Sequence, residues 1–184
     1  MNINTEYFAE ASTVFLRDVA FLQYMTAAVT YIFVKRKGCN MLKDLTLKKQ
    51  ITINASADAV WDVLVNPAKI KQYLFETNTV SDWKEGSEIK FTGEWNGKTY
   101  TDKGTILALR KNSVFHYSYF SSFSPLPDLP ENYSTVKFTL TPDGTATLLQ
   151  LEQWGFPDEN ALSHSDTNWD SIAAQMKQLA ETNS

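Results

Sequence analysis

The sequence predicts one α+β domain, in which a curved antiparallel sheet wraps around a long C-terminal helix. The order of its patterns carries this prediction: a half-buried strand, two short helices, a run of strands with period two, and a last helix. Composition agrees, because aromatic residues make up 13% of the chain and suit a pleated, half-buried surface. A chain of 184 residues is long enough for one such domain and an extension.

The first strand and the two short helices are predicted between residues 45 and 74. Apolar and polar residues alternate over 45–53, which indicates a strand buried on one face. Ser56 or Asp58 can cap the helix that follows, where apolar residues recur at helical spacing over 57–65. Asn66 and Pro67 end that helix, and Pro67 suits the first position of a second one.

Asn96-Gly97 is a strong signal for a β-hairpin with a two-residue loop. Such a loop places on one face the residues Phe91, Gly93, Trp95, Lys98, Tyr100 and Asp102. If this is the inner face, Asp102 is a carboxylate among aromatic rings and must be paired, protonated or solvated. If it is the outer face, Asp102 lies in solvent near Lys103 or Arg110.

Further strands are expected over 98–109, 114–120, 133–141 and 145–154, with a turn at 142–144 and a loop over 121–132. Ser163 with Asp166 is typical of a helix start. The closing helix carries an apolar stripe that indicates a core-facing side: Leu162, Ser165, Trp169, Ile172, Met176 and Leu179.

Charge and cysteine content exclude several classes of function. A net charge of −4 leaves no domain-wide basic field, so nucleic acid is not an expected partner. One cysteine and two histidines do not supply an intramolecular disulfide or a Cys/His zinc site, and no EF-hand or phosphate-binding glycine motif is present. We therefore expect no metal and no cofactor, and a cytoplasmic location.

Residues 1–40 form a separate region, and the domain is expected over 41–184. Residues 19–34 are uncharged and precede Lys35, Arg36 and Lys37. A secretory signal is disfavoured because acidic rather than basic residues come before the apolar run. Three alternatives stay open: a helical extension that is not native, an amphipathic or partner-binding helix, and a membrane anchor, for which the run is short of about 20 residues.

Five short segments carry a family resemblance: residues 51–65 (ITINASADAVWDVLV), Tyr100-x-Asp102-x-Gly104, residues 120–128 (FSSFSPLPD), residues 130–133 (PENY) and residues 164–169 (HSDTNW). In this order they resemble the START-like, or SRPBCC, superfamily, and within it the family of activators of the heat-shock protein 90 ATPase. The resemblance covers about residues 45–182 and implies the helix-grip fold, with a cavity between sheet and helix. The superfamily includes lipid carriers, hormone receptors, cyclases and chaperone cofactors, so the fold alone does not select a function. The ATPase activator resembles a two-domain protein, and we expect no counterpart of its separate chaperone-docking domain in residues 1–40, which are too few to form one.

The predicted site is this cavity, and its expected occupant is a small apolar or aromatic molecule. The candidate residues are Trp61, Phe91, Trp95, Tyr100, Asp102, Tyr117, Tyr119, Trp154, His164, Asn168, Trp169, Ile172 and Met176. Asp102, Tyr100 and either His164 or Asn168 would supply polar contacts, whereas the aromatic residues are also compatible with simple core packing. No catalytic residue is assigned, because His164 does not face its sequence neighbours on a helix and no nucleophile-elbow motif exists.

The leading hypothesis is an accessory or carrier protein for an apolar ligand. A second hypothesis is an interaction module for a chaperone or another protein, through the proline-rich loop 120–133, which carries Phe120, Phe123, Leu126 and Leu129. That loop could instead be a lid, or simply fold over one end of the sheet. A third hypothesis is a cyclase or hydrolase that uses Asp102 as general base.

Overall fold

The computed structural model describes residues 45–182, so the predictions for residues 1–40 and for the boundary at residue 41 lie outside the described residues. The elements in chain order are β1 (Thr46–Ile53), α2 (Ala57–Val65), α3 (Pro67–Tyr73), β2 (Asn78–Ser81), β3 (Glu88–Trp95), β4 (Lys98–Arg110), β5 (Val114–Tyr119), the short 3-10 helix η1 (Pro130–Asn132), β6 (Ser134–Asp143), β7 (Ala146–Trp154) and α4 (Glu159–Thr182). This order confirms the predicted α+β helix-grip architecture.

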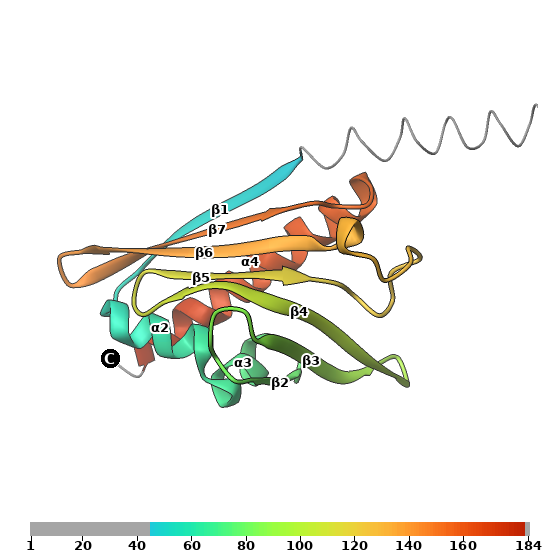
Figure 1. Cartoon of the computed structure of the whole chain (residues 1–184). Helices are drawn as coiled ribbons and strands as arrows, with labels where there is room; N and C mark the ends of the chain where they lie inside the picture. Colours follow the sequence, from blue (N-terminus) through green and yellow to red (C-terminus); the bar gives the residue numbers. More distant parts are fainter. Residues whose placement is uncertain (1–44, 183–184) are drawn as a thin grey trace, which may run out of the picture. The chain divides into compact units, whose positions relative to one another are not determined.

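The strands form one seven-stranded antiparallel sheet in the order β1-β7-β6-β5-β4-β3-β2. β1 and β2 are its two edges, and the helical segment α2–α3 carries the chain from one edge to the other (Figure 1). β4 joins the two parts of the sheet and contains an irregularity between Ile106 and Ala108. Strong curvature follows, because such irregularities increase local twist.

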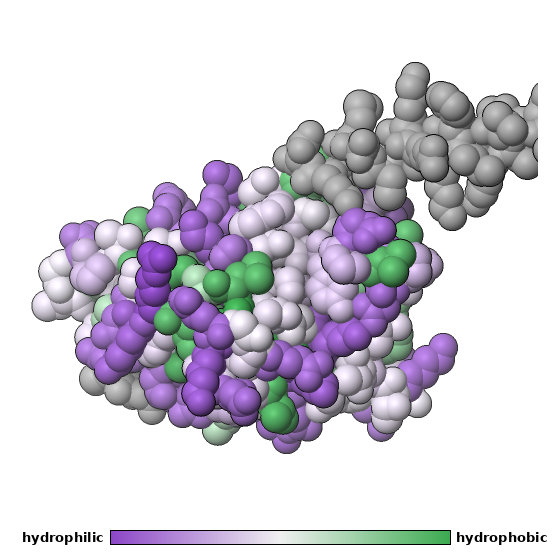
Figure 2. Space-filling model, viewed as in Figure 1, coloured by the Kyte–Doolittle hydropathy of each residue, from purple (hydrophilic) through white to green (hydrophobic). Residues whose placement is uncertain are grey.

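Helix α4 runs behind the sheet and covers its inner face (Figure 1). Its buried residues are Trp169, Ile172, Met176 and Ala180, at helical spacing. The predicted apolar stripe is therefore confirmed at its centre, whereas Leu162 and Leu179 are only partly buried. The opposite face of the sheet is turned to solvent, and Figure 2 shows hydrophilic side chains over much of it. Within residues 45–182, no helix has the length and apolar character that a membrane crossing requires.

Side-chain capping explains where the short helices begin. Ser56 is the N-cap of α2, and its hydroxyl accepts a hydrogen bond from the backbone N–H of Ala59 at 3.3 Å. Asn66 ends α2 and caps α3, accepting from the N–H of Ala68 at 3.1 Å, and Pro67 takes the first helical position. Both predicted helices are confirmed in this way.

Three local predictions are corrected. Helix α4 begins at Glu159 rather than near Ser163, because Asp158 accepts from the N–H of Ala161 at 2.8 Å and caps the helix earlier. The last hairpin turns after Asp143, which pairs with Ala146, so residues 142–143 belong to β6. Strand β2 was not predicted at all.

One long side of α4 is fixed to β1 by charged and polar contacts. Lys49 Nζ lies 2.8 Å from Asp166 and 2.6 Å from Asp170, and these bonds raise the pKa of Lys49. Further along, Lys177 Nζ donates to the carbonyl oxygen of Thr52 at 2.6 Å. The helix is thereby held along the β1 edge, and the space on its other side is available for a cavity.

Candidate functional site

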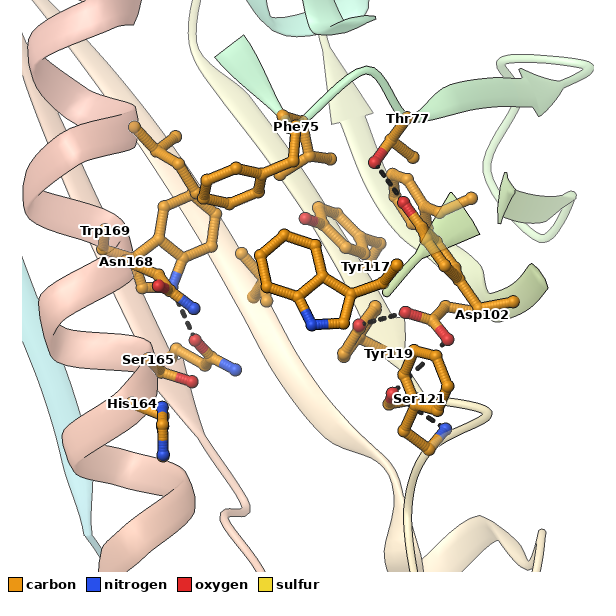
Figure 3. Close-up of a pocket in the computed structure, with 18 residues that line it drawn as sticks. Phe75, Thr77, Asp102, Tyr117, Tyr119, Ser121, His164, Ser165, Asn168 and Trp169 are labelled. Atoms are coloured by element: carbon orange, nitrogen blue, oxygen red, sulfur yellow. Dashed lines mark hydrogen bonds between the residues drawn. The ribbon is translucent and has the colours of Figure 1, made fainter. Parts of the chain in front are cut away.

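A cavity of about 470 Å³ lies between the N-terminal half of α4 and strands β3 to β7. Its volume is in the range of small-molecule sites. The walls are mostly aromatic and apolar, as Figure 3 shows, with a smaller number of polar groups. The lining residues are Leu74, Phe75, Thr77, Phe91, Trp95, Tyr100, Asp102, Tyr117, Tyr119, Ser121, Phe123, Val136, Gln153, His164, Ser165, Asn168, Trp169 and Ile172.

The structure brings together all but three of the predicted site residues. Trp154 lies on the other face of β7, against the ring of His116, because Gln153 takes the inward position in the alternation of the strand. Trp61 is buried in α2 as part of the core, and Met176 is buried further along α4; neither lines the cavity. Trp61 and Met176 therefore pack in the core, and Trp154 lies on the outer face of the sheet, so none of the three is placed to contact a ligand in this cavity.

Eight lining residues were not predicted, and three of them come from one segment. Leu74, Phe75 and Thr77 lie in the connection from α3 to β2, a strand that was not expected. The alternation of β7 could have identified Gln153. Leu149 and Leu151 face inward, so residue 153 must face the same side of the sheet. The other missed lining residues are Ser121, Phe123, Val136 and Ser165.

Asp102 lies on the inner face of the sheet, so the first of the two alternatives for the hairpin, inner rather than outer face, applies. The predicted pairing of Phe91 with Asp102 is confirmed, and the carboxylate is 6% exposed. Its Oδ2 accepts from the hydroxyl of Tyr119 at 2.5 Å, and its Oδ1 accepts from the backbone N–H and the hydroxyl of Ser122 at 2.7 and 2.9 Å. The hydroxyl of Ser121 lies 3.4 Å from the same Oδ1.

These contacts make Asp102 the anchor of the loop that follows β5. The hydroxyl of Ser122 also accepts from the backbone N–H of Thr101 at 3.2 Å, so the loop is joined to β4 at two successive residues. Burial, and then the neighbouring carboxylate, raise the pKa of Tyr119 well above its ordinary value. Tyr119 therefore stays protonated and keeps donating its hydrogen bond at neutral pH.

Two polar groups that line the cavity have no hydrogen-bond partner within residues 45–182. The hydroxyl of Tyr117 makes no hydrogen bond to another residue in 45–182, and burial alone raises its pKa. Gln153 uses its Oε1 to accept from Trp169 Nε1 at 2.6 Å, and its amide nitrogen has no partner in the described part of the chain. Both groups can hydrogen-bond to a ligand or to water in the cavity.

Tyr100 is held over a glycine on the neighbouring strand. It pairs across the hairpin with Gly93, where a side chain carbon would meet the Tyr100 hydroxyl at 2.6 Å. The same hydroxyl lies 2.6 Å from Thr77 Oγ1. The ring thus has one supported position at the wall of the cavity, with one contact from β3 and one from the residue that directly precedes β2.

Exposed aromatic residues from three segments surround the mouth of the cavity. Phe75 is 47% exposed, Trp95 56% and Phe123 51%, although each belongs to the lining. Phe75 packs edge-on against Trp95, with ring centroids 6.2 Å apart. Figure 3 shows His164 and Asn168 on the α4 side of this opening, and both are solvent-exposed. Within residues 45–182, no cluster of His, Cys, Asp or Glu is arranged to hold a metal ion.

Comparison with solved structures shows the same fold in bacterial proteins. The chain is 43% identical to ChR145 from Cytophaga hutchinsonii, with 78% of this chain and 98% of that chain covered and a TM-score of 0.67. Protein MLL2253 from Mesorhizobium loti is 24% identical, with 76% and 99% covered and a TM-score of 0.64. The Aha1 dimer from Colwellia psychrerythraea is 17% identical, with 74% and 96% covered and a TM-score of 0.60.

No curated protein matches the sequence. The family model described as activator of Hsp90 ATPase homolog 1-like protein matches residues 54–181, which include every residue that lines the cavity. The chain therefore belongs to the family of proteins that are similar to the activator of Hsp90 ATPase homolog 1.

Proposed function

We propose that this protein binds a small, mostly apolar molecule in the cavity between α4 and the sheet, as an accessory or carrier protein. The observation that carries the proposal is the wall itself: aromatic surface surrounds polar groups, at Tyr117 and Gln153, that have no partner among the described residues. Neither group is among the fully buried side-chain atoms that lack a partner within residues 45–182, so both have surface open to the cavity, where a ligand or water can hydrogen-bond to them. A cytoplasmic location stays a prediction.

Asp102 acts in this proposal as a positioning residue. Both of its oxygens accept hydrogen bonds from the loop and from Tyr119, so its contacts serve to hold the cavity mouth in place. A general base must lie within hydrogen-bond reach of the proton that it removes. Asp102 is 6% exposed and its hydrogen bonds go to the loop and to Tyr119, so they favour a positioning role over the cyclase or hydrolase hypothesis.

Native mass spectrometry of the full chain, purified from its own host, tests the proposal. We expect a discrete non-covalent mass that organic extraction releases. Ser165→Trp should abolish this mass, because Ser165 lines the cavity from α4 and a tryptophan there fills it. Ser171→Trp is the matched control, since Ser171 lies on the same helix, is exposed and is not part of the lining. A clean apo mass, with thermal stability unmoved by a panel of lipids and aromatic metabolites, would refute ligand binding.

A second candidate function is protein interaction through loop 120–133. The observation that favours it is the exposure of Phe123 at 51% and Leu129 at 44%, while Phe120 of the same loop is buried. Phe123→Asp with Leu129→Asp should then abolish stimulation of the heat-shock protein 90 ATPase by this chain. Val80→Asp, at a residue 65% exposed and outside the loop, is the control and should leave stimulation unchanged. Absence of any stimulation by the unaltered chain would remove this function.

A further inference from the structure

The charged side chain in the cavity lining is acidic, and no Lys or Arg lines the cavity. The only carboxylate of the lining is Asp102. The ion pairs found within residues 45–182 do not include Asp102. The neighbouring Lys103 is engaged elsewhere, with its Nζ 2.5 Å from Asp128. Within residues 45–182, the negative charge of Asp102 is therefore hydrogen-bonded but has no cation at ion-pair distance.

The aromatic walls also contribute negative electrostatic potential to the cavity. The face of an aromatic ring carries negative potential and attracts a cation within about 6 Å of its centre. Tyr117 and Trp169 line the cavity from opposite sides, and Phe75, Trp95 and Phe123 line its mouth. A carboxylate ligand would lose its water without meeting a cation, whereas a positive group would meet both the ring faces and the field of Asp102.

We propose that the cavity selects apolar organic cations, such as aromatic ammonium compounds, and rejects carboxylates, including fatty acids. This inference rests on the proposed binding function and specifies the ligand class. The apolar body of the ligand occupies the space between α4 and β5, and its ammonium group lies among the ring faces on the Asp102 side. Tyr117 and Gln153 hydrogen-bond to any polar atom on the remainder of the ligand.

Isothermal titration of the full chain at neutral pH with three probes of one shape tests the charge preference. The probes are naphthylmethylammonium, naphthylmethanol and naphthoate, which share a ring system and differ in charge. We expect the ammonium to bind more tightly than the alcohol by on the order of tenfold, and naphthoate to bind most weakly. Naphthoate or the alcohol binding as tightly as the ammonium would overturn the inference and leave the binding function standing. If none of the probes binds and Ser165→Trp changes nothing, the binding function and this inference fail together.

Two variants assign the preference to Asp102. Asp102→Asn keeps the size of the side chain and removes its charge, so most of the difference in Kd between the ammonium and the alcohol should disappear. Ser122→Ala is the matched control, because it removes a hydrogen bond to Asp102 and leaves the charge. It should change the affinity for both probes alike. An unchanged ratio in Asp102→Asn, or equal loss of the ratio in both variants, would contradict the role of the carboxylate charge.

Discussion

The two halves of α4 meet the rest of the domain in different ways. The C-terminal half buries its inner side: Met176 and Ala180 are 1% and 0% exposed, against α2 and the sheet. The N-terminal half carries the exposed His164 and Asn168 and faces the cavity. One end of the helix thus supplies the buried apolar surface that stabilises the fold, and the other end is free to form a site.

The largest expected effect is a difference in the free energy of unfolding between substitutions in the two halves of α4. Met176→Ala should lower the free energy of unfolding by about 2–5 kcal/mol, because it leaves a hole among fully buried side chains. Ser165→Ala, in the cavity wall of the same helix, should change it by less than about 0.5 kcal/mol. Urea denaturation with matched m-values measures both. A loss below about 1 kcal/mol in Met176→Ala would mean that the closed end is not where the stability lies.

Next to the cavity, the backbones of β4 and β5 nevertheless pack closely together. Gly104 in β4 passes so near to β5 that a Cβ atom would lie 1.6 Å from the carbonyl oxygen of Ser118. Gly104→Ala should therefore destabilise the protein by about 3 kcal/mol, since a backbone atom has to move. Thr105→Ala is the neighbouring control, and urea denaturation is again the measurement. Equal stability of the two variants would show that β4 and β5 can separate at no cost.

The sequence predicted best what is decided locally. Asn96-Gly97 determined the register of its hairpin, and with it the shared face of Phe91 and Asp102, because a two-residue loop permits only that pairing. The 3.6-residue period similarly identified the buried side of α4, whose stripe needs no knowledge of its partners.

What the sequence could not supply depends on chain segments that meet only in the fold. β2 has four residues and buries only Thr79, so no alternation marks it. Phe75 and Glu76 turn the chain with positive φ angles of 49° and 59°, without the glycine that usually signals such a turn. The partners of Asp102 lie about twenty residues further along the chain, and the pairing of β4 with β5, whose register shifts between Ile106 and Ala108, brings them beside it.

Two tyrosines of β5, Tyr117 (buried) and Tyr119 (partly buried), test whether the polar groups of the cavity wall have partners within the protein. Tyr119→Phe removes the donor to Asp102 and should cost about 1–3 kcal/mol, since a buried carboxylate oxygen loses its partner. Tyr117→Phe removes a hydroxyl that has no hydrogen-bond partner in the described part of the chain, and it should change stability by less than about 0.5 kcal/mol. Chemical denaturation compares the two. Equal losses would indicate that the Tyr117 hydroxyl is bonded in solution, which would remove an argument for ligand binding.

Tyr117 and Tyr119, together with Tyr73 of α3, predict a loss of stability in alkali. Burial raises the pKa values of Tyr73, Tyr117 and Tyr119 above the ordinary value of 10.0. The folded protein therefore keeps phenol protons that the unfolded chain releases, so stability is complete below pH 10 and falls as the pH rises further. Each tyrosine should contribute about 1.4 kcal/mol per pH unit above that point. Urea denaturation between neutral pH and pH about 11 should show this slope, and a smaller one in Tyr117→Phe. A flat profile would mean that these phenols ionise freely in the folded state.

The smallest effect on stability is expected at the mouth. Phe123→Ser should alter the free energy of unfolding by less than about 0.5 kcal/mol, because the side chain is half exposed. Its aromatic contact is with the Tyr100 ring, at a centroid distance of 5.9 Å. Phe115→Ser, in the buried cluster of β5, is the contrast and should cost several times more. If Phe123→Ser keeps its stability and weakens binding of the ammonium probe, the ring serves the ligand. If it destabilises the protein like Phe115→Ser, the mouth belongs to the core, and the distinction between a packed half and a functional half of the domain does not hold.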